Sequence, residues 1–544
     1  MLLELKNILE KGVKVFPKRI LVLLMIVIIG IFLRSYNFHS WLDFGSDQVN
    51  DAIRVGAVVD GKAPWPEYGP DMGNSGKGGR SNRFRLGPMY YDFEIISAKI
   101  FGNKPVAMAY PDLLFSILSL PLFYFFLRRI FSINLSLALT GLYAVSFYAL
   151  TFSHSAWNVN SIPFFSLLFL LSLYEFILAK EKTQWGWIAA LGISLGVSVQ
   201  LHAILMVLFP ATLFFACLIF MRKNLSAWKK LGVVILLMFI LNLGQLVGES
   251  RSGFKNSKIF LESITGSSTR SSDSLLVKAS NNLSCTFQAN AYMLSSIGSS
   301  DCDFSLSQFV AGGEVGKSFF KKSTRVDFVG KVIICLMFSL IGYGILIKNF
   351  KKEKLLKRKY FYGLILLYAG LSFFVMLPVI DTAIRYFVHL FFLPFIFLGL
   401  IINFLAQKFN KKYLAIAMMM LIVLVVSNAS SIYLEVKNDF VQSRIILGPV
   451  EDMVEYMIVD AGTQKEIYLY TDSGGSDYIK SLRYVAAEKN VSLLKAGDGD
   501  KISSEKARFY LNTGKGNISA TQVNGMNYDR YRVFNQVALF HLTN

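Results

Sequence analysis

Three aspartates follow the first apolar run of the chain, in the stretch LDFGSDQVNDAIRV. They are Asp43, Asp47 and Asp51, spaced four residues apart. A carboxylate just beyond a membrane span can stay ionised at the interface and accept a proton. Alternatively, Ser46 or Asp47 caps a short amphipathic helix predicted over residues 48–59, where an acid favours the helix dipole. Asp47 is therefore either a general base or a helix cap.

Other short loops carry more polar side chains than a simple turn needs. SHSAWNVN (153–160) contains a histidine, an indole and amides, VQLH (199–202) ends in a glutamine and a histidine, and DTAIRY (381–386) ends in an Arg-Tyr pair. Structural alternatives exist, since a lone histidine at a helix end is usually an interfacial hydrogen-bonding residue. An Arg-Tyr pair can simply anchor a helix at the membrane surface.

The elements that must position these loops are membrane helices. The chain has 544 residues, of which 53% are hydrophobic, too many for a water-soluble globule of this length. About eleven apolar runs are long enough to cross or nearly cross a bilayer. Their approximate ranges are 18–35, 106–127, 133–152, 161–179, 185–201, 203–221, 231–248, 330–348, 360–378, 386–406 and 412–429. No cleavage site follows the first run, so we interpret it as an uncleaved anchor.

Basic residues indicate the orientation of these spans. The net charge of +20 comes from short bursts of Lys and Arg between apolar runs, which does not favour a nucleic-acid partner. With the N-terminus in the cytoplasm, every burst falls inside, whereas the short loops on the other side carry only Arg385. We therefore predict a bacterial cytoplasmic membrane protein whose polar short loops share the outer face.

Two domains are expected, a transmembrane domain over 1–430 and an extracytoplasmic domain over 431–544. The first has long outer loops over 36–105, with surface helices, and over 249–329, a Ser-rich segment. The second is predicted as a small α/β unit because strand-like runs bracket a helical pattern. Its TDSGG turn could hold an anion but lacks a full phosphate-binding fingerprint.

Together these loops place a carboxylate, amides, aromatic rings and a guanidinium at one membrane level. Nucleotide sugars stay in the cytoplasm, so a sugar donor at the outer face must be linked to a polyprenyl phosphate. Arg385 could neutralise that phosphate with its bidentate fork. Asp47 could take the proton from an acceptor hydroxyl attacking the opposite face of the sugar, which predicts inversion. Retention would require a second carboxylate as nucleophile, and no second outer loop offers one.

The order of these motifs resembles the C superfamily of glycosyltransferases. The similar branch depends on polyprenyl phosphate and contains protein O-mannosyltransferases and the lipid A aminoarabinose transferase. The matching motifs are GSDQ (45–48), LGPMYY (86–91), SAWNVN (155–160), QLH (200–202) and the RY of IRYFVHLFFLP (384–394). In that family the first outer loop supplies the catalytic acid, often in an Asp-Glu dyad. Here the pair is Asp47-Gln48, so the second member is an amide.

The resemblance implies a set of substrate-binding residues around Asp47. Relatives often have Trp-Asn-Pro-Asn where this chain has Trp157-Asn158-Val159-Asn160; the change alters a turn and keeps the amides. The expected acceptor is a protein, a glycolipid or a polysaccharide. The predicted donor phosphate-binding residues are Arg385, Tyr386, Arg83 and Arg85, and the predicted substrate-binding residues are Gln48, Asp51, Tyr90, Tyr91, His154, Trp157, Asn158, Asn160, Gln200 and His202.

Several features have more than one interpretation. Arg83 and Arg85 could add positive potential near the phosphate or simply be solvated. No residue spacing supports a metal site, so a divalent cation is only a possible cofactor. Cys285 and Cys302 share an outer loop and could form a disulfide or remain free thiols.

Two other classes of protein fit a multi-pass chain. A lipid or sugar transporter would have polar residues near the midplane of several spans and often internal repeats. No clear repeat is present, and the spans are almost purely apolar apart from Asn242 and Gln245. A non-catalytic envelope scaffold would not need polar short loops. The glycosyltransferase interpretation is therefore preferred over both.

Overall fold

The structure is a computed structural model. It describes residues 18–72, 83–178, 184–221, 225–265, 274–296, 302, 326–378, 383–409, 412–437, 444–497, 506–514, 518–519, 521–535 and 537–543. Parts of the two predicted outer loops, at 73–82, 266–273, 297–301 and 303–325, and the first two residues of the 381–386 loop lie outside these ranges.

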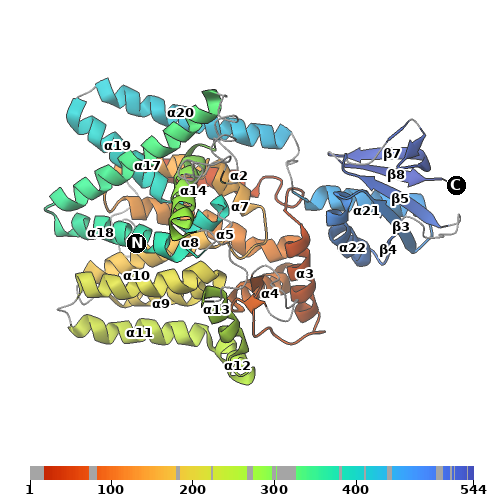
Figure 1. Ribbon diagram of the computed structural model, residues 1–544, viewed down its shortest axis with the longest axis horizontal. Coiled ribbons are helices and arrows are strands. Elements are labelled where there is room, and N and C mark those ends of the chain that lie inside the picture. The colour runs from red at the N-terminus through yellow and green to blue at the C-terminus, as the bar shows by residue number, and fades with distance from the viewer. Residues whose placement is uncertain are drawn as a thin grey trace.

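A bundle of apolar helices forms most of the molecule (Figure 1). Each predicted apolar run coincides with a helix or a bent pair of helices. The helices are α2 (Lys18–Ser35), α5 (Pro105–Leu127), α6 (Ile133–Ala144), α7 (Phe147–Ser153), α8 (Ile162–Leu178), α9 (Gln184–Leu201), α10 (Ala203–Phe220), α11 (Leu225–Leu241), α12 (Leu243–Arg251), α17 (Val326–Lys352), α18 (Leu356–Met376), η3 (Ile384–Leu390), α19 (Leu393–Phe409) and α20 (Lys412–Lys437).

Three of the spans are broken by sharp bends. α6 and α7 meet at 53°, α11 and α12 at 62°, and η3 and α19 at 60°. Among the described residues, five helices are long and apolar enough to cross a membrane, or eight if each bent pair is one span. The predicted helical membrane fold is confirmed, whereas the number of about eleven spans stays a prediction.

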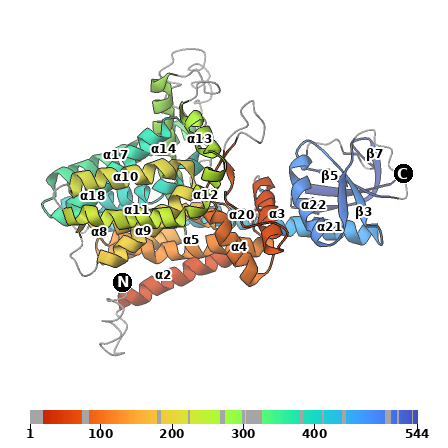
Figure 2. The same cartoon turned by 90° about the horizontal axis from the view of Figure 1, so that it is seen from below.

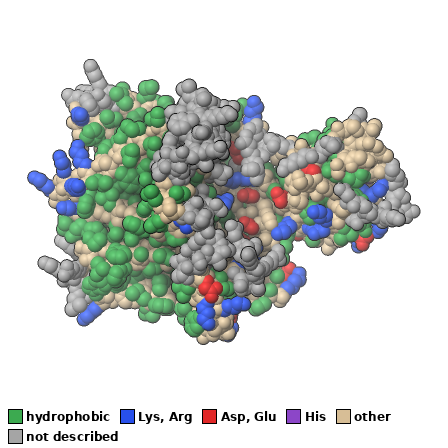
Figure 3. All heavy atoms as spheres, viewed as in Figure 1, with side chains coloured by type: hydrophobic (Ala, Val, Ile, Leu, Met, Phe, Trp, Pro, Cys, Tyr) green, Lys and Arg blue, Asp and Glu red, His purple; other side chains and the backbone are tan. Residues whose placement is uncertain are grey.

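The outer surface of the bundle is suited to lipid. Large apolar side chains are exposed along it, among them Met25, Phe214 and Met419. Figure 3 shows these hydrophobic side chains covering the bundle, while charged side chains gather at its two ends. A contiguous apolar surface of this extent would be unstable in water, so the chain is a multi-pass membrane protein.

Short helices cover the end of the bundle that faces the C-terminal domain. α3 (Ser46–Val59) and α4 (Met89–Phe101) pack against each other, and α4 also packs on α5. Nearby, β1 (Asp71–Met72) pairs antiparallel with β2 (Phe84–Arg85), which contacts α13 (Lys255–Thr265). The two predicted surface helices after the first span correspond to α3 and α4.

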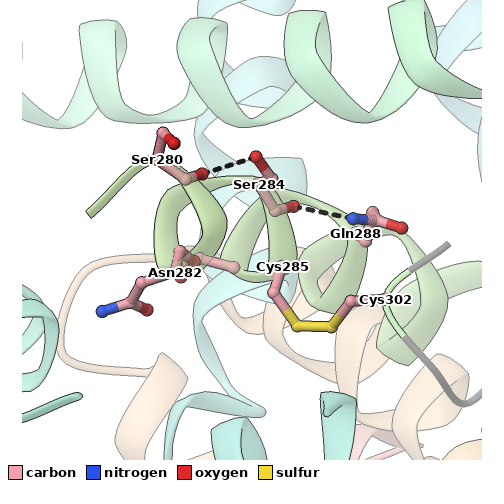
Figure 4. Close-up of a disulfide and its surroundings, with 7 residues drawn as sticks. Ser280, Asn282, Ser284, Cys285, Gln288 and Cys302 are labelled. Atoms are coloured by element: carbon pink, nitrogen blue, oxygen red, sulfur yellow. Dashed lines mark hydrogen bonds between the residues drawn. A yellow bond between two sulfur atoms is a disulfide. The ribbon is translucent and has the colours of Figure 1, made fainter. Parts of the chain in front are cut away.

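A polar helix, α14 (Leu275–Ser295), lies within the segment that the sequence indicated only as Ser-rich. It packs beside α17, α19 and η3. Its polar side chains can be buried because backbone carbonyls accept their hydrogen bonds. The Ser284 hydroxyl donates to the Ser280 carbonyl, and the Gln288 amide donates to the Ser284 carbonyl (Figure 4). Cys285 on this helix forms a disulfide with Cys302, with 5.2 Å between their Cα atoms.

The C-terminal domain stands apart from the bundle and lies next to α3 (Figures 1 and 2). Its elements are α21 (Leu447–Ala461), β3 (Glu466–Thr471), η4 (Gly475–Tyr478), α22 (Ile479–Glu488), β4 (Ser492–Lys495), β5 (Ala507–Asn512), β6 (Gln522–Val523), β7 (Met526–Phe534) and β8 (Val537–Leu542). The sheet has the order β4-β3-β5-β8-β7-β6, with β3 parallel to β4 and β5 and the remaining neighbours antiparallel.

The predicted α/β character of this domain is confirmed, with α21, β4 and β6 as additional elements. The TDSGG turn is closed by its own acid. Asp472 accepts hydrogen bonds from the backbone N–H groups of Gly475 and Thr513, both at 2.7 Å. A carboxylate already occupies these donors, which does not favour an external anion there.

Candidate active site

Asp47 lies in the first turn of α3, and the helix begins without a side-chain cap. The N-cap residue is Gly45, and no side chain bonds the free N–H groups there. Ser46 and Asp47 are both exposed. The capping alternative therefore lacks its hydrogen bond, and the Asp47 carboxylate is open to solvent at the positive end of the helix dipole.

The segment that precedes Asp47 is held from two sides. The backbone N–H of Asp43 donates to the His154 carbonyl at 2.8 Å, and that of Phe44 donates to Ile445 at 2.7 Å. The N–H of Leu447 returns a bond to the Leu42 carbonyl at 2.8 Å. The backbone segment before Asp47 is therefore held by hydrogen bonds between the 153–160 loop and the C-terminal domain.

Helix α22 of the C-terminal domain also contacts this segment. The Ser481 hydroxyl donates to the Phe44 carbonyl at 2.7 Å, and the Lys480 ammonium donates to the Ser46 hydroxyl at 2.9 Å. The rings of Phe44 and Tyr484 pack edge to face, 5.3 Å apart. A domain from the far end of the chain therefore directly supports the residue next to Asp47.

Gln48 links α3 to the 153–160 loop. Its amide nitrogen lies 3.5 Å from the Ser155 hydroxyl. In that loop the amide nitrogens of Asn158 and Asn160 donate to the backbone carbonyls of Leu201 and Ser155, at 2.5 and 2.7 Å. The two asparagines are buried and fix the shape of the loop.

His154 is enclosed rather than open. Its ring packs near Phe38 and Trp41, and its Nε2 lies 3.3 Å from the Tyr36 carbonyl. Burial lowers the pKa of His154. Its observed environment is therefore a neutral, buried ring at the end of α2, and its backbone carbonyl accepts the bond from Asp43.

Asp51 is buried one turn after Asp47. The Tyr91 hydroxyl donates to its carboxyl at 2.5 Å, and Arg54 lies 3.3 Å from the same hydroxyl. Burial raises the pKa of Asp51 to about 7, and the hydrogen bond from Tyr91 and the charge of Arg54 oppose that rise. Asp51 joins α3 to α4 and is far less accessible than Asp47.

Two buried carboxyl groups were not among the predicted residues. Asp112 in α5 is 1% exposed and accepts bonds from the Tyr90 hydroxyl at 2.9 Å, the Ser161 hydroxyl at 2.7 Å and the Trp157 N–H at 3.1 Å. Glu94 in α4 is also buried, and burial raises its pKa well above its usual value. An acid within an apolar run was the signal that could have identified Asp112.

Arg85 is paired with a carboxylate, and Arg83 lies beside it. The Arg85 guanidinium lies 3.2 Å from Asp71, and the backbone N–H of Arg85 donates to the Asn256 side chain at 2.7 Å. Arg83 is half-buried. The ion pair of Arg85 serves the β1–β2 hairpin, so a role toward a phosphate would require this pair to open.

Gln200 and His202 lie where the LGPMYY motif meets the end of α9. The Gln200 side-chain oxygen accepts from the Met89 N–H at 3.3 Å. A Cβ atom on Gly87 would lie 2.3 Å from that same oxygen, so this close approach requires glycine. His202 caps α10 by accepting the Ile204 N–H at 3.2 Å, and burial lowers its pKa to about 4.

Arg385 is exposed at the start of η3. Its guanidinium stacks over the neighbouring Tyr386 ring at 5.4 Å, and that ring lies 6.3 Å from the His202 ring. No carboxylate pairs with Arg385 among the residues that the structure describes. Its charge is therefore available to a ligand.

Several of the predicted residues lie in one series of contacts at one end of the bundle, which begins at Gln48, next to Asp47, and does not include Arg85. It runs from Gln48 to Ser155, through the 153–160 loop to Asn158 and α9, and from His202 to Tyr386 and Arg385. Tyr90 and Tyr91 tie α4 to the same region through Asp112 and Asp51. Within the described ranges, no three potential metal ligands cluster. The possible divalent cation is untested by this geometry.

Comparison with known proteins gives a family match over part of the chain. Residues 87–244 match the model of the family described as dolichyl-phosphate-mannose-protein mannosyltransferase. No curated protein matches the chain.

Solved structures with a similar fold include ArnT from Cupriavidus metallidurans. The apo form is 10% identical with a TM-score of 0.50, and the form bound to undecaprenyl phosphate is 12% identical with a TM-score of 0.51. In both cases 96% of this chain and 97% of ArnT are covered.

The oligosaccharyltransferase AglB from Archaeoglobus fulgidus, in complex with an inhibitory peptide and a dolichol-phosphate, is 13% identical with a TM-score of 0.49, over 86% of this chain and 63% of AglB. The match of residues 87–244 and the ArnT-like fold together confirm the predicted resemblance to the polyprenyl-phosphate-dependent C-superfamily glycosyltransferases.

Proposed function

We propose that this protein is an inverting glycosyltransferase that moves a sugar from a polyprenyl-phosphate donor to an acceptor hydroxyl at the outer face of a bacterial cytoplasmic membrane. One observation carries the proposal. An exposed carboxylate, Asp47, and an exposed guanidinium without a carboxylate partner, Arg385, are connected by a chain of contacts at the same end of the bundle.

The proposed reaction has one displacement step. The acceptor hydroxyl attacks the anomeric carbon, and Asp47 takes its proton as the new C–O bond forms. The bond between the anomeric carbon and the phosphate oxygen breaks, and the phosphate leaves with the electron pair. Arg385 stabilises the additional negative charge on the polyprenyl phosphate through charge-assisted hydrogen bonds. A single displacement inverts the anomeric configuration.

Exposure selects Asp47 among the carboxylates of this region. Asp51 and Asp112 accept hydrogen bonds from buried tyrosines, and Glu94 is enclosed. Burial also raises the pKa of Asp43, although the charge of Arg444 opposes the rise. A general base must reach a substrate hydroxyl and be ionised. Among these five residues Asp47 is the most exposed, whereas Asp43 is half-buried.

We infer the donor class from the similarity to ArnT and to the mannosyltransferase family. The proposed acceptor is a hydroxyl of a protein, a glycolipid or a polysaccharide. Tyr386, Gln48, Tyr91 and Trp157 are proposed to line the donor and acceptor sites, because they belong to the connected set. A divalent cation is possible, and its binding is part of the proposal to be tested by chelation in the transfer assay.

The decisive experiment is mass spectrometry of cell-envelope glycans with and without this chain. We expect one sugar modification to disappear on deletion, to return with the wild-type chain, and to stay absent with Asp47→Asn. The variant must reach the membrane in wild-type amounts. Restoration of the modification by Asp47→Asn would contradict the assignment of the base, and an unchanged glycan profile on deletion would favour a scaffold or transporter.

A further inference from the structure

The turn η3, which carries Arg385, does not continue into the helix that follows it. Proline lacks a backbone N–H, and its ring clashes with the carbonyl four residues earlier, so Pro394 cannot extend a helix that includes Leu390. The chain instead forms a 3₁₀ turn over Ile384–Leu390, and α19 begins at Leu393 after a bend of 60°. The backbone around Arg385 therefore lacks the support of a continuous helix.

A 3₁₀ turn of this length needs support from its surroundings. It has seven residues, whereas runs longer than about three or four are uncommon because their hydrogen bonds are poorly aligned. One polar side chain of the turn, His389, is buried, with 1% of its surface exposed. A buried imidazole is costly unless it is hydrogen-bonded. The partners of His389 therefore show what it supports.

His389 forms hydrogen bonds in two directions. Its Nε2 atom lies 2.7 Å from the hydroxyl of Ser372, which is on α18 and is itself buried. The ring also hydrogen-bonds the backbone of Tyr386, in the same turn. A neutral imidazole has one donor and one acceptor nitrogen, so these two bonds satisfy it. His389 therefore ties the backbone of Tyr386 to α18.

A second residue of α18 reaches the same histidine. The Tyr368 hydroxyl lies 3.5 Å from the His389 carbonyl, and the two rings meet edge to face, 6.0 Å apart. Tyr368 and Ser372 are four residues apart, so they share one face of α18. This face of α18 thus contacts both the ring and the backbone of His389.

Other buried polar side chains in the bundle find their partners locally. Ser172 and Thr212 donate to carbonyls of their own helices, at 3.1 and 2.7 Å, a common pattern for these residue types. Such a bond satisfies the hydroxyl without joining two elements. An apolar residue would fill the place of His389 without any need for partners. A buried histidine that joins η3 to α18 therefore points to a role in fixing the turn.

Tyr386 connects this support to Arg385. The backbone of Tyr386 is held by His389, and its ring lies 6.3 Å from the ring of His202, the residue that caps α10. The Arg385 guanidinium stacks over the same Tyr386 ring at 5.4 Å. The tyrosine on which Arg385 rests is thus contacted by histidines from two different parts of the bundle.

We propose that His389 is a positioning residue for Arg385: it holds the Tyr386 backbone against α18 and so fixes the place where Arg385 meets the lipid phosphate. This role rests on the proposed function. His389 is buried and Arg385 is exposed, so the histidine acts through the turn and does not itself touch the donor. A backbone that is already ordered loses less conformational entropy when the donor binds.

The test measures the affinity of the full-length protein in nanodiscs for undecaprenyl phosphate. Ser372→Ala should weaken binding by about threefold to tenfold, because the turn loses one buried hydrogen bond. Ser372→Thr keeps the hydroxyl and should restore the affinity. His389→Leu removes both side-chain bonds and should weaken binding at least as much as Ser372→Ala. Ser194→Ala is the matched control, since this buried serine donates to the Leu191 carbonyl of its own helix, at 3.0 Å, and its loss should leave binding unchanged.

Arg385→Ala separates positioning from general stability. Alone, it should weaken binding by about tenfold. If His389 acts through Arg385, adding Ser372→Ala to Arg385→Ala should cause no further loss, because the group being positioned is gone. A bond that only stabilises the bundle would lower the affinity by the same factor in both backgrounds, and that additive result would overturn the proposal.

Hydrogen exchange gives a second readout, which does not depend on the ligand. The backbone amides of η3 should exchange faster in Ser372→Ala than in the wild type, whereas those of α9 should be unchanged. Equal exchange of η3 in the two proteins would overturn the anchoring role of the bond between Ser372 and His389.

The outcomes also distinguish this role from the proposed function. A wild-type protein that does not bind undecaprenyl phosphate, or an Arg385→Ala variant that binds it normally, would contradict the proposed function. If Arg385→Ala weakens binding while Ser372→Ala and His389→Leu bind normally, only the role of His389 is contradicted.

Discussion

The segment that leads to Asp47 and the turn that carries Arg385 are held by different kinds of contact. Backbone hydrogen bonds from the 153–160 loop and from residues 445–447 fix the first, and two side chains of α22 add to them. The turn η3 has four buried apolar side chains, its buried His389 lies 2.7 Å from the Ser372 hydroxyl, and its exposed Arg385 stacks on the neighbouring Tyr386.

This difference matches what each residue would have to do. A general base must be within about 3 Å of the proton it removes, so its backbone must be positioned before the acceptor arrives. A guanidinium that binds a lipid phosphate must follow a donor that enters from the bilayer. The segment of the proposed base is therefore positioned by the fold, whereas the proposed phosphate-binding arginine is exposed.

Removing the base should have the largest effect. Asp47→Asn is expected to lower kcat by about 10²–10⁴-fold while the KM for the donor stays unchanged, because general-base catalysis contributes about that much. Asp60→Asn is the matched control at the other end of α3, where the carboxylate pairs with Lys62. Steady-state transfer assays with a lipid-linked sugar measure both constants. An unchanged kcat would remove Asp47 from the mechanism.

Removing the exposed cation should affect binding as well as turnover. Arg385→Ala is expected to raise the KM for the donor by about tenfold, since one charge-assisted interaction with phosphate is lost. Arg385→Lys should recover part of the loss because the charge remains without the bidentate geometry. Equal donor KM values for the wild type and Arg385→Ala would show that this guanidinium does not touch the phosphate.

Loosening the support of the Asp47 segment should have a smaller effect. The double variant Lys480→Ala, Ser481→Ala removes two bonds from α22 and should lower kcat by about threefold to tenfold, because each bond contributes about 1 kcal/mol. The donor KM should not change. Lys495→Ala, an exposed change in the same domain, is the control. If the double variant and the control turn over equally fast, the C-terminal domain does not position the base.

The smallest effect concerns stability and pH at Asp51, which joins α3 to α4. Its folded pKa of about 7 lies above the ordinary aspartate pKa of 3.8, so the folded state holds the proton more tightly. This contribution to stability is present below pH 4 and is lost as the pH rises to about 7. The drop in Tm between pH 5 and pH 8 should therefore be a few degrees smaller for Asp51→Asn than for the wild type. An identical pH profile in thermal unfolding would show that Asp51 is ionised when folded.

Much of the outer site followed from local patterns. Charge and amide clusters in short loops between apolar runs marked Asp47, Gln200 and Arg385 as candidates, because the positive-inside rule predicts that such loops share one face. The C-terminal domain was recognisable from alternating apolar residues and turns. These signals depend only on neighbours along the chain.

The environment of other residues could not be read from the local sequence. α14 is rich in Ser and Asn and lacks an apolar stripe, so only its packing against α17 and η3 makes it a buried helix. Asp112 and Arg34 lie inside apolar runs that are hydrophobic enough to predict a span despite the charged residue. Their environments depend on partners from other helices, such as Tyr90 and Ser116.

The sequence by itself determined that this chain is a helical membrane protein with polar loops on one face and an α/β domain at its end. That information is contained in hydrophobic runs and charge distribution, which act over one span or one loop. Only the tertiary structure decided which carboxylates are buried, that residues 445–447 and α22 hold the Asp47 segment, and that Arg34 is fully buried. Burial and hydrogen bonding join residues hundreds of positions apart, and no local pattern specifies those pairs.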